Sequence, residues 1–336
     1  ENGVEPIVTM MHFTSPKWLI ENGGWENEAT VEAFKNYCQY VTEQLGDLMH
    51  YVCTINEANM GIQVAAISAR YRAQMMAKMQ RMQQGGAEEK KDLEGTAQVG
   101  MNFNDMMANM QKQKEENVEI FGTDTLQTFV SARTPEGDML VIRAHQAARA
   151  AMKAVKPELQ IGLTLSLHDI QAQEGGEETA AKEWVDEFTH YVPYIKEDDF
   201  FGLQNYSRSL IGPNGILPVP EGAEITQMDY EYYPEGLEHV IRRVYEEMPM
   251  PIMVTENGIA TADDTRRVAY IQTAMKGVEN CIQDGIPVKG YMYWSMMDNF
   301  EWQKGFGMTF GLISVDRTTQ TRTAKPSLTV LGNYTK

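Results

Sequence analysis

Short hydrophobic runs alternate with longer segments whose hydrophobic residues recur every three or four positions, along most of the chain. The longer segments predict helices at residues 28–46, 67–84, 141–156, 177–191, 233–247 and 264–284. The short runs predict buried strands at residues 5–13, 50–57, 160–167, 199–206, 251–256 and 288–295. Regular alternation of strand and helix is typical of a parallel α/β barrel, which is the fold we expect.

Two of these strands pass abruptly from hydrophobic residues to an acid. Residues 252–254 are hydrophobic and lead to Glu256, and the strand that begins at Tyr51 ends in Asn56 and Glu57. The carboxyl ends of parallel barrel strands share the face on which active sites are built. A solvent-facing glutamate is the alternative for either position alone, but two carboxylates on two strands are the pair that glycoside hydrolysis uses.

The last expected strand leads into an aromatic and acidic segment. Residues 291–302 contain Trp294 and Trp302 together with Asp298 and Glu301. Aromatic rings beside carboxylates suit a sugar, because a sugar has apolar C–H faces and a rim of hydroxyl groups. Plain packing in the core is the alternative for the two tryptophans.

Composition narrows the classes of partner. The 336 residues carry 47 acidic and 29 basic side chains, a formal net charge of −18. That excess argues against nucleic acid, which needs a basic footprint, and against an anionic membrane surface, but it leaves a neutral small-molecule substrate unaffected. Cys38, Cys53 and Cys281 match no zinc or redox spacing, so we expect reduced thiols and a cytoplasmic location. The acids and histidines show no metal-ligand spacing and there is no glycine-rich phosphate loop, so the sequence implies no metal or cofactor.

Three stretches together resemble a known enzyme family. Thr54–Glu57, Thr255–Gly258 and Trp294–Trp302 are similar to the signatures of glycoside hydrolase family 1, the retaining β-glucosidases and their relatives, and occur in the family's order. The resemblance implies a (β/α)8 TIM barrel and hydrolysis by double displacement, with Glu57 as acid/base and Glu256 as nucleophile. It also implies that Tyr206 holds Glu256 and favours its anion.

The resemblance further implies a set of sugar-binding residues around the two acids. Asn56 would hydrogen-bond the sugar 2-hydroxyl, and Glu301 would accept hydrogen bonds from the outer hydroxyls. Trp294 would form the floor beneath the sugar ring. The other implied binding residues are His12, Gln204, Trp302 and Phe310. Two departures from the family pattern are Ala58, in place of proline, and Gln204, in place of asparagine.

Residues 60–135 form an unusual excursion within what we expect to be a single catalytic domain spanning residues 1–336. The helix at 67–84 and a second run at 101–110 are rich in methionine, and the polar stretch 85–92 predicts an exposed loop between them. A methionine stripe is usually adaptable packing. The alternative is that the excursion covers the mouth of the active site and shapes the leaving-group subsite.

The six expected strands are two fewer than the family's barrel contains. The start of the chain resembles the approach to the family's third strand, and nothing matches the glutamine and arginine motifs of the first two. Two missing strands would leave unpaired edges and an open core. We therefore expect that this chain alone is not a closed, fully active barrel, and that a preceding segment, a homo-oligomer or a second chain completes it.

The leading hypothesis is a retaining β-glycosidase that acts on glucosides or short oligosaccharides. β-Galactosidase and β-fucosidase specificities stay open. A 6-phosphosugar is disfavoured, because the charge of Glu301 would repel a phosphate at close range. The other classes are a non-catalytic sugar-binding relative, which usually loses one of the two glutamates, and an inactive or partner-dependent fragment.

Overall fold

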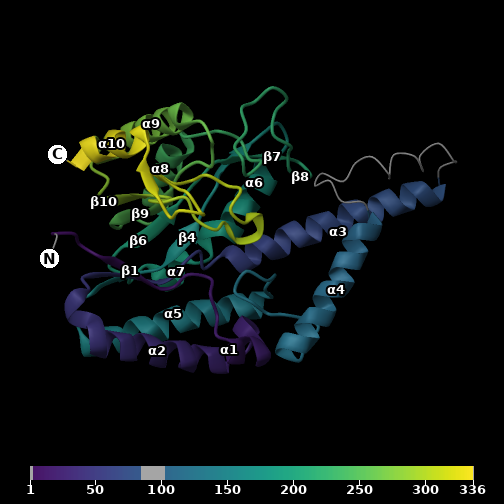
Figure 1. The fold of residues 1–336 in the computed structure, drawn as a ribbon, viewed down its shortest axis with the longest axis horizontal. Coiled ribbons are helices and arrows are strands. Elements are labelled where there is room, and N and C mark those ends of the chain that lie inside the picture. Colours follow the sequence, from purple (N-terminus) through teal and green to yellow (C-terminus); the bar gives the residue numbers. More distant parts are fainter. Residues whose placement is uncertain (1–2, 85–102, 336) are drawn as a thin grey trace. The chain divides into compact units, whose positions relative to one another are not determined.

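The structure, a computed structural model, describes residues 3–84 and 103–335 and is drawn as a ribbon in Figure 1. These residues form two compact units. The first unit comprises Glu1–Met10, Thr42–Glu57 and Met152–Lys336, and the second comprises Met11–Val41 and Ala58–Ala151. Glu57 and Glu256 both belong to the first unit, which therefore contains the candidate chemistry. The expectation of a single domain stays a prediction.

The six expected strands are present, arranged in two sheets, and apart from Met11 at the end of β1 they belong to the first unit. One sheet has the order β1 (Ile7–Met11), β2 (Tyr51–Ile55), β3 (Gln160–Gly162). The other has the order β10 (Val288–Tyr293), β9 (Ile252–Asn257), β6 (Phe201–Gln204), β4 (Thr164–Ser166). The pairings β2–β3, β4–β6, β6–β9 and β9–β10 are all parallel. Because Leu163 interrupts the strand expected at 160–167, it is found as β3 and β4.

The central strands are buried, which explains their sequence pattern. Val52 in β2, Leu203 in β6 and Val254 in β9 have no exposed surface. Burial on both faces of a parallel sheet makes its strands continuous hydrophobic runs, without polar residues at every second position. Burying each such side chain contributes about 1.5–3 kcal/mol to folding. Cys53 and Met253 add a packed cluster with the ring of Phe200.

Helices α8 (Gly236–Glu247) and α9 (Asp264–Gln283) pack against each other in this unit (Figure 1). The buried residues of α8 lie three or four positions apart, the spacing of one helix face: Leu237, Val240, Ile241 and Val244. Helix α9 begins at an N-cap, where Asp263 accepts a hydrogen bond of 2.9 Å from the backbone amide of Thr265. The first unit also contains α6 (Glu177–Trp184), η4 (Val185–Thr189), α7 (Val192–Ile195) and α10 (Pro326–Gly332), and the short helices η2 (Gly46–Leu48), η5 (Trp302–Lys304) and η6 (Asn333–Thr335).

The second unit is helical. It contains α1 (Lys17–Glu21), α3 (Met60–Gln84), α4 (Phe103–Phe121) and most of α2 (Ala29–Leu45) and α5 (Pro135–Val155). Its aromatic core places the ring of Trp25 5.3 Å from Phe129 and 5.7 Å from Phe34. Arg133 stacks on Phe129 and donates a hydrogen bond of 2.5 Å to the carbonyl of Ala58.

The methionine-rich excursion falls in the second unit. Helix α3 includes the helix expected at 67–84, and Met76 on it is exposed. The loop expected at 85–92 and the side chains of the run at 101–110 lie outside the described residues. Whether the excursion packs through its methionines or covers an active site stays a prediction.

Two small sheets follow barrel strands and were not expected. Strands β5 (Asp169–Ala172), β7 (Arg208–Gly212) and β8 (Gly215–Ile216) form one, and β11 (Ile313–Val315) pairs with β12 (Arg322–Ala324) in the other. All five strands have five residues or fewer. They are short and mix polar with apolar residues, so no continuous hydrophobic run marks them in the sequence.

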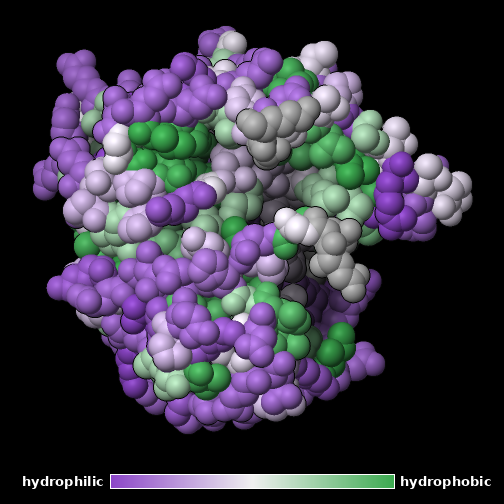
Figure 2. All heavy atoms as spheres, turned by 90° about the vertical axis from the view of Figure 1, so that its left-hand side faces the viewer, coloured by the Kyte–Doolittle hydropathy of each residue, from purple (hydrophilic) through white to green (hydrophobic). Residues whose placement is uncertain are grey.

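The molecular surface agrees with the acidic, polar composition. Figure 2 shows hydrophilic residues over most of one face, with hydrophobic residues in separate patches between them. Within the described ranges, no helix is both long enough and apolar enough to cross a membrane.

Candidate active site

Glu57 stands two residues after the end of β2, in a constrained backbone conformation. Its φ of 45° lies in the left-handed region, which residues other than glycine rarely occupy. Its backbone amide donates a hydrogen bond of 2.9 Å to the hydroxyl of Thr164 in β4, and that hydroxyl donates to the carbonyl of Ile55 at 3.2 Å. The neighbouring strand thus fixes the turn that presents this buried carboxyl group, an unusual geometry of the kind that clusters at functional sites.

Glu256 stands near the end of β9, opposite Gln204 of β6 in the parallel register. Its carboxylate accepts a hydrogen bond of 2.6 Å from the hydroxyl of Tyr206, and its side chain is buried. A short hydrogen bond to a charged oxygen is among the stronger kinds. It holds the carboxylate in one orientation and stabilises its ionised form.

A hydrogen-bonded layer behind Glu256 holds this arrangement together. Asn257 donates to the carbonyl of Asn205 at 2.6 Å and to the hydroxyl of Tyr270 at 3.0 Å, and it accepts from the hydroxyl of Tyr291 at 2.8 Å. Tyr270 in turn donates to the carbonyl of Tyr206 at 3.1 Å. Strands β9 and β10 and helix α9 therefore jointly fix the residues on either side of Glu256 and Tyr206.

Asn56 and Gln204 meet between β2 and β6. The Gln204 amide nitrogen donates a hydrogen bond of 2.7 Å to the Asn56 amide oxygen, and both side chains are buried. This bond uses the oxygen of Asn56 and therefore fixes which way its amide faces. The amide oxygen of Gln204 has no hydrogen-bond partner among the described residues. A buried acceptor of this kind is costly and marks a site where a further group is expected.

The surroundings of Glu57 and Glu256 shift the pKa values of the two carboxyl groups to different extents. Burial raises the pKa of Glu57 well above its ordinary value, and the charges of Glu256 and Glu301 raise it further. Burial also raises the pKa of Glu256, to about 7, and Glu301 adds to this shift, but the hydrogen bond from Tyr206 opposes it. Because only Glu256 has this stabilising hydrogen bond, the pair favours a charge on Glu256 and a proton on Glu57.

Glu301 lies on the loop after β10, within electrostatic reach of both glutamates. Burial raises the pKa of Glu301, while a hydrogen bond with Trp294 opposes the shift. One of its carboxylate oxygens is buried and makes no hydrogen bond within the part of the chain that is described. On the same segment, Trp302 is 38% exposed, and the buried ring of Phe310 packs edge-on 6.2 Å from Tyr206. These groups therefore lie around a shared region of the first unit.

Three other polar residues make contacts of a different kind. His12 belongs to the second unit, where its ring packs edge-on against Phe13, and its sugar-binding role stays a prediction. Two polar residues after β4, for which the sequence predicted no role, are bonded to helical elements. His168 pairs with Glu187 at 2.8 Å and Asp169 pairs with His239 at 2.7 Å. The first pair ties the connection between β4 and β5 to η4, and the second ties β5 to α8.

Sequence reasoning missed three polar residues of the site. Thr164 supports Glu57, Tyr270 supports Tyr206, and Tyr230 has its ring 6.5 Å from that of Tyr206. A threonine between leucines in a buried strand was a weak signal for the first. The two tyrosines had none, because one lies on an amphipathic helix and the other in a loop. Within the described residues, no group of three side chains is suited to hold a metal ion.

Comparisons with known proteins identify the family. The sequence profile of Glycosyl hydrolase family 1 matches residues 1–84 and 198–334. β-Glucosidase A of Thermotoga maritima is 26% identical in an alignment 375 positions long. The alignment covers 97% of this chain and 72% of the relative. The 6-phospho-β-galactosidase of Lacticaseibacillus casei is 25% identical in an alignment 367 positions long. This alignment covers 96% of this chain and 74% of the relative.

A solved structure supports the same assignment. The crystal structure of β-glycosidase BGL167 is 41% identical and superposes with a TM-score of 0.81, over 99% of this chain and 73% of that protein. The α/β barrel fold expected from the sequence is therefore confirmed, as is the resemblance on which the candidate site was built. The chain belongs to glycosyl hydrolase family 1.

Proposed function

We propose that the protein is a retaining β-glycosidase, with Glu256 as nucleophile and Glu57 as acid/base. The observation that carries the proposal is the unequal pair of buried carboxyl groups. Glu256 is held by Tyr206 at 2.6 Å, and Glu57 has its pKa raised by burial and by the charge of Glu256. Retaining hydrolysis needs one ionised carboxylate to attack and one protonated carboxyl to assist departure.

In the first step, Glu256 attacks the anomeric carbon while Glu57 gives its proton to the departing oxygen. The covalent glycosyl-enzyme no longer carries a negative charge on Glu256, so the pKa of Glu57 falls. Glu57 is then ionised and takes a proton from water as the water attacks the anomeric carbon. This return reaction releases the sugar with its original configuration and restores both groups.

We propose further that the sugar is an unphosphorylated glucoside or a close relative of one. The family alone leaves this open, because β-glucosidase A and a 6-phospho-β-galactosidase both match the chain. The acids favour a neutral sugar: Glu256 and Glu301 are close enough to Glu57 to raise its pKa, and Glu301 also raises the pKa of Glu256. A phosphate brought among them would be repelled. The open oxygen of Glu301 suits a sugar hydroxyl as its donor.

The test is hydrolysis of a panel of 4-nitrophenyl β-glycosides by the purified chain, with gluco, galacto, fuco and 6-phosphogluco sugars. We expect turnover of at least one neutral sugar, and proton NMR of the first product formed should show the β-anomer. Formation of the α-anomer, or preference for the 6-phosphoglucoside, would contradict the proposal. Binding without turnover of any sugar would instead favour the non-catalytic alternative.

A further inference from the structure

The loop that carries Glu301 and Trp302 is closed at its base by a mostly buried lysine. We call residues 298–311 the sugar loop; Asp298 and Gly311 form its base. The amide of Gly311 donates to the carboxylate of Asp298 at 2.8 Å. Lys325, just before α10, donates to both oxygens of that carboxylate at 3.1 and 3.0 Å and to the carbonyl of Gly311 at 2.6 Å. One ammonium group therefore joins both ends of the loop.

The two ends of the sugar loop touch through their backbones. A Cβ atom at Gly311 would come within 2.1 Å of the backbone nitrogen of Asp298 and 2.4 Å of the carbonyl carbon of Met297. Only glycine permits this approach. The amide of Asp298 also donates to the carbonyl of Ile313 at 2.9 Å. These contacts hold the base of the sugar loop in one position, and the base in turn helps to position Glu301 and Phe310 within the loop.

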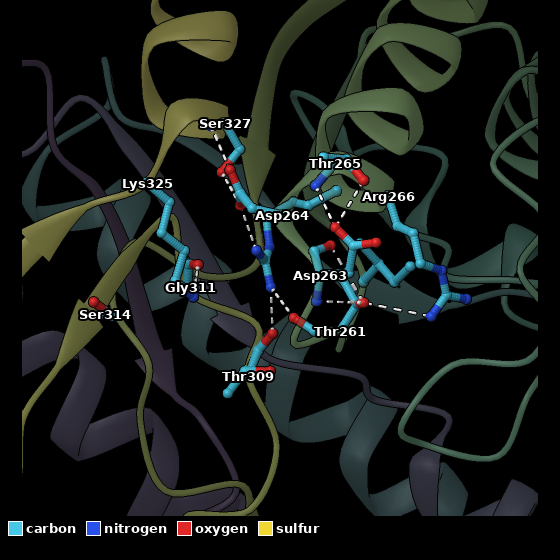
Figure 3. A network of polar contacts seen from close by, with 12 residues as sticks. Thr261, Asp263, Asp264, Thr265, Arg266, Thr309, Gly311, Ser314, Lys325 and Ser327 are labelled. Carbon is cyan, nitrogen blue, oxygen red and sulfur yellow. Dashed lines mark hydrogen bonds and ion pairs between the residues drawn. The ribbon is translucent and has the colours of Figure 1, made fainter.

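A second cation holds the same loop from its other side. Arg267 of α9 is almost wholly buried and donates to the carbonyls of Thr309 at 2.6 Å and Thr261 at 2.5 Å. Its other nitrogen pairs with Asp264 at 2.5 Å, and Asp264 accepts two hydrogen bonds from Ser327, at 2.7 and 2.9 Å. Figure 3 shows Ser327 and Lys325 beside Asp264, with Thr309 and Gly311 below them.

We call Arg267, Lys325, Asp264 and Asp298 the balanced cluster, because it contains two cations and two anions. Asp298 and Lys325 are mostly buried, at 12% and 16% side-chain exposure. A buried pair of this kind is costly to break by removing one partner. It anchors α9, the start of α10 and the sugar loop to one another, although none of its four charges belongs to the proposed chemistry.

We propose that Lys325 is a positioning residue for sugar recognition. By closing the base of the sugar loop, it holds the open carboxylate oxygen of Glu301 and the ring of Phe310 where they meet the outer part of the sugar. This inference rests on the proposed function, since it assigns the sugar loop to that substrate. Loss of the Lys325 ammonium should therefore reduce the preference for a sugar that has its outer hydroxyls over one that lacks a hydroxyl. This loss of preference should come in addition to any effect on folding.

The chain offers a matched control at the opposite end of the strands. Lys153 pairs with Asp199 at 2.9 Å and also donates to the carbonyl of Pro157, and Asp199 accepts from the amide of Ile161. This lysine–aspartate pair has 22% and 20% side-chain exposure, similar to the Lys325 pair. It ties α5 to the beginnings of β3 and β6, and Glu256 stands at the other end of the neighbouring β9. Lys153→Met therefore removes an equivalent buried bond without touching the sugar loop.

The experiment compares Lys325→Met, Lys153→Met and the unaltered chain on 4-nitrophenyl β-glucoside and its 6-deoxy analogue, well below each melting temperature. For Lys325→Met we expect the preference for the glucoside to fall about tenfold, mainly through KM, because a small misplacement of a binding group has a large effect on rate. Lys153→Met should keep the original preference while losing a similar amount of thermal stability. Equal preferences in all three proteins would overturn the inference.

A binding measurement separates this inference from the proposed function. If the unaltered chain shows no turnover, the same three proteins are titrated calorimetrically with the unreactive 1-thio-β-glucoside and its 6-deoxy analogue. A loss of discrimination in Lys325→Met alone supports the positioning role even when the catalytic proposal has failed. Binding that is absent, or equally selective in all three, overturns it.

Discussion

Two clusters of buried acids lie in the first unit, and they differ in how their charges are compensated. In the balanced cluster, Asp264 bonds to Arg267 and Ser327; burial acts to raise its pKa, but these bonds outweigh burial and lower it. In the acid cluster, which we define as Glu57, Glu256 and Glu301, burial raises every pKa, and the charges of neighbouring acids raise those of Glu57 and Glu256 further. Carboxylates bonded to cations anchor the structure, whereas carboxyls that repel one another are suited to hold and transfer protons.

The two clusters are close neighbours in the sequence. Glu256 and Asp264 are separated by the short loop between β9 and α9, and Asp298 and Glu301 lie on one loop. The balanced cluster fixes the segments on which two members of the acid cluster stand. We infer that the balanced cluster stabilises the fold and thereby offsets the cost of burying the acid cluster. Functional sites commonly lower stability in this way, and other parts of the fold compensate.

The largest effect is expected from removing the attacking carboxylate. Glu256→Ala should lower kcat by about four orders of magnitude or more, because no other group in the site can form the covalent intermediate. Added azide should partly restore cleavage of an activated aryl glucoside and give the α-glycosyl azide, which chromatography detects. Near-normal turnover by this variant, with its folding verified by circular dichroism, would remove Glu256 from the nucleophile role.

Removing the proton donor should have a smaller effect that depends on the leaving group. Glu57→Ala should slow substrates with poor leaving groups by about 10²–10⁴-fold, and activated aryl glycosides much less, because an acid matters most when the departing oxygen needs a proton. The measurement is the slope of log(kcat/KM) against leaving-group pKa, which should steepen. An unchanged slope would mean that another group supplies the proton.

The hydrogen bond between Tyr206 and Glu256 can be broken without changing a charge. Tyr206→Phe should lower kcat by about 10–100-fold through loss of positioning. This hydrogen bond lowers the pKa of Glu256, so its loss raises that pKa. Because Glu256 must be ionised to attack, the acidic limb of the kcat/KM profile should move to higher pH. A limb that stays in place would show that Tyr206 does not stabilise the Glu256 anion.

The smallest effects are on stability, and they should have opposite signs in the two clusters. Glu57 has a raised pKa in the folded protein, so it destabilises the fold increasingly as pH rises above its unfolded pKa. Glu57→Gln should therefore gain about 1–2 kcal/mol in free energy of unfolding at pH 7, and little at pH 4. Urea unfolding at the two pH values measures this.

Asp264 provides the matched contrast. Its folded pKa is lowered, so its stabilisation is present above the unfolded pKa and is lost as pH falls through the folded pKa. Asp264→Asn should lose about 2–3 kcal/mol at pH 7 and less at pH 3, because it breaks a mostly buried ion pair. Loss of stability in both variants would mean that the two clusters do not differ in the way described.

The sequence predicted the framework well because the framework follows from periodicity. The strand runs that became β2, β6 and β9 were found within a few residues of their observed bounds, since burial on both faces makes them unmistakably hydrophobic. The strand-end acids were found because the change from hydrophobic to acidic is abrupt there. The short strands β11 and β12 were not found, because each mixes polar and apolar residues and forms no continuous hydrophobic run.

The sequence could not predict which distant polar residues support the acids. Thr164 bonds to Glu57 across 107 positions of the sequence, and Lys325 bonds to Asp298 across 27. Such contacts depend on strand register and loop closure. Neither can be read from the pattern of hydrophobic and polar residues in a short stretch of sequence. Lys325 in particular is one of many surface-like lysines in the sequence, and only the fold shows it buried against the sugar loop.

The central claim is that Glu256 forms a covalent bond to the sugar, and trapping tests it most directly. A 2-deoxy-2-fluoro-β-glucoside with an activated leaving group slows both steps, so the glycosyl-enzyme should accumulate and be visible by mass spectrometry. We predict one added fluoroglycosyl group per chain, located on Glu256 after proteolysis, and no label in Glu256→Ala. A label on any other residue, or steady hydrolysis of an ordinary glucoside by a chain that never becomes labelled, would contradict the account.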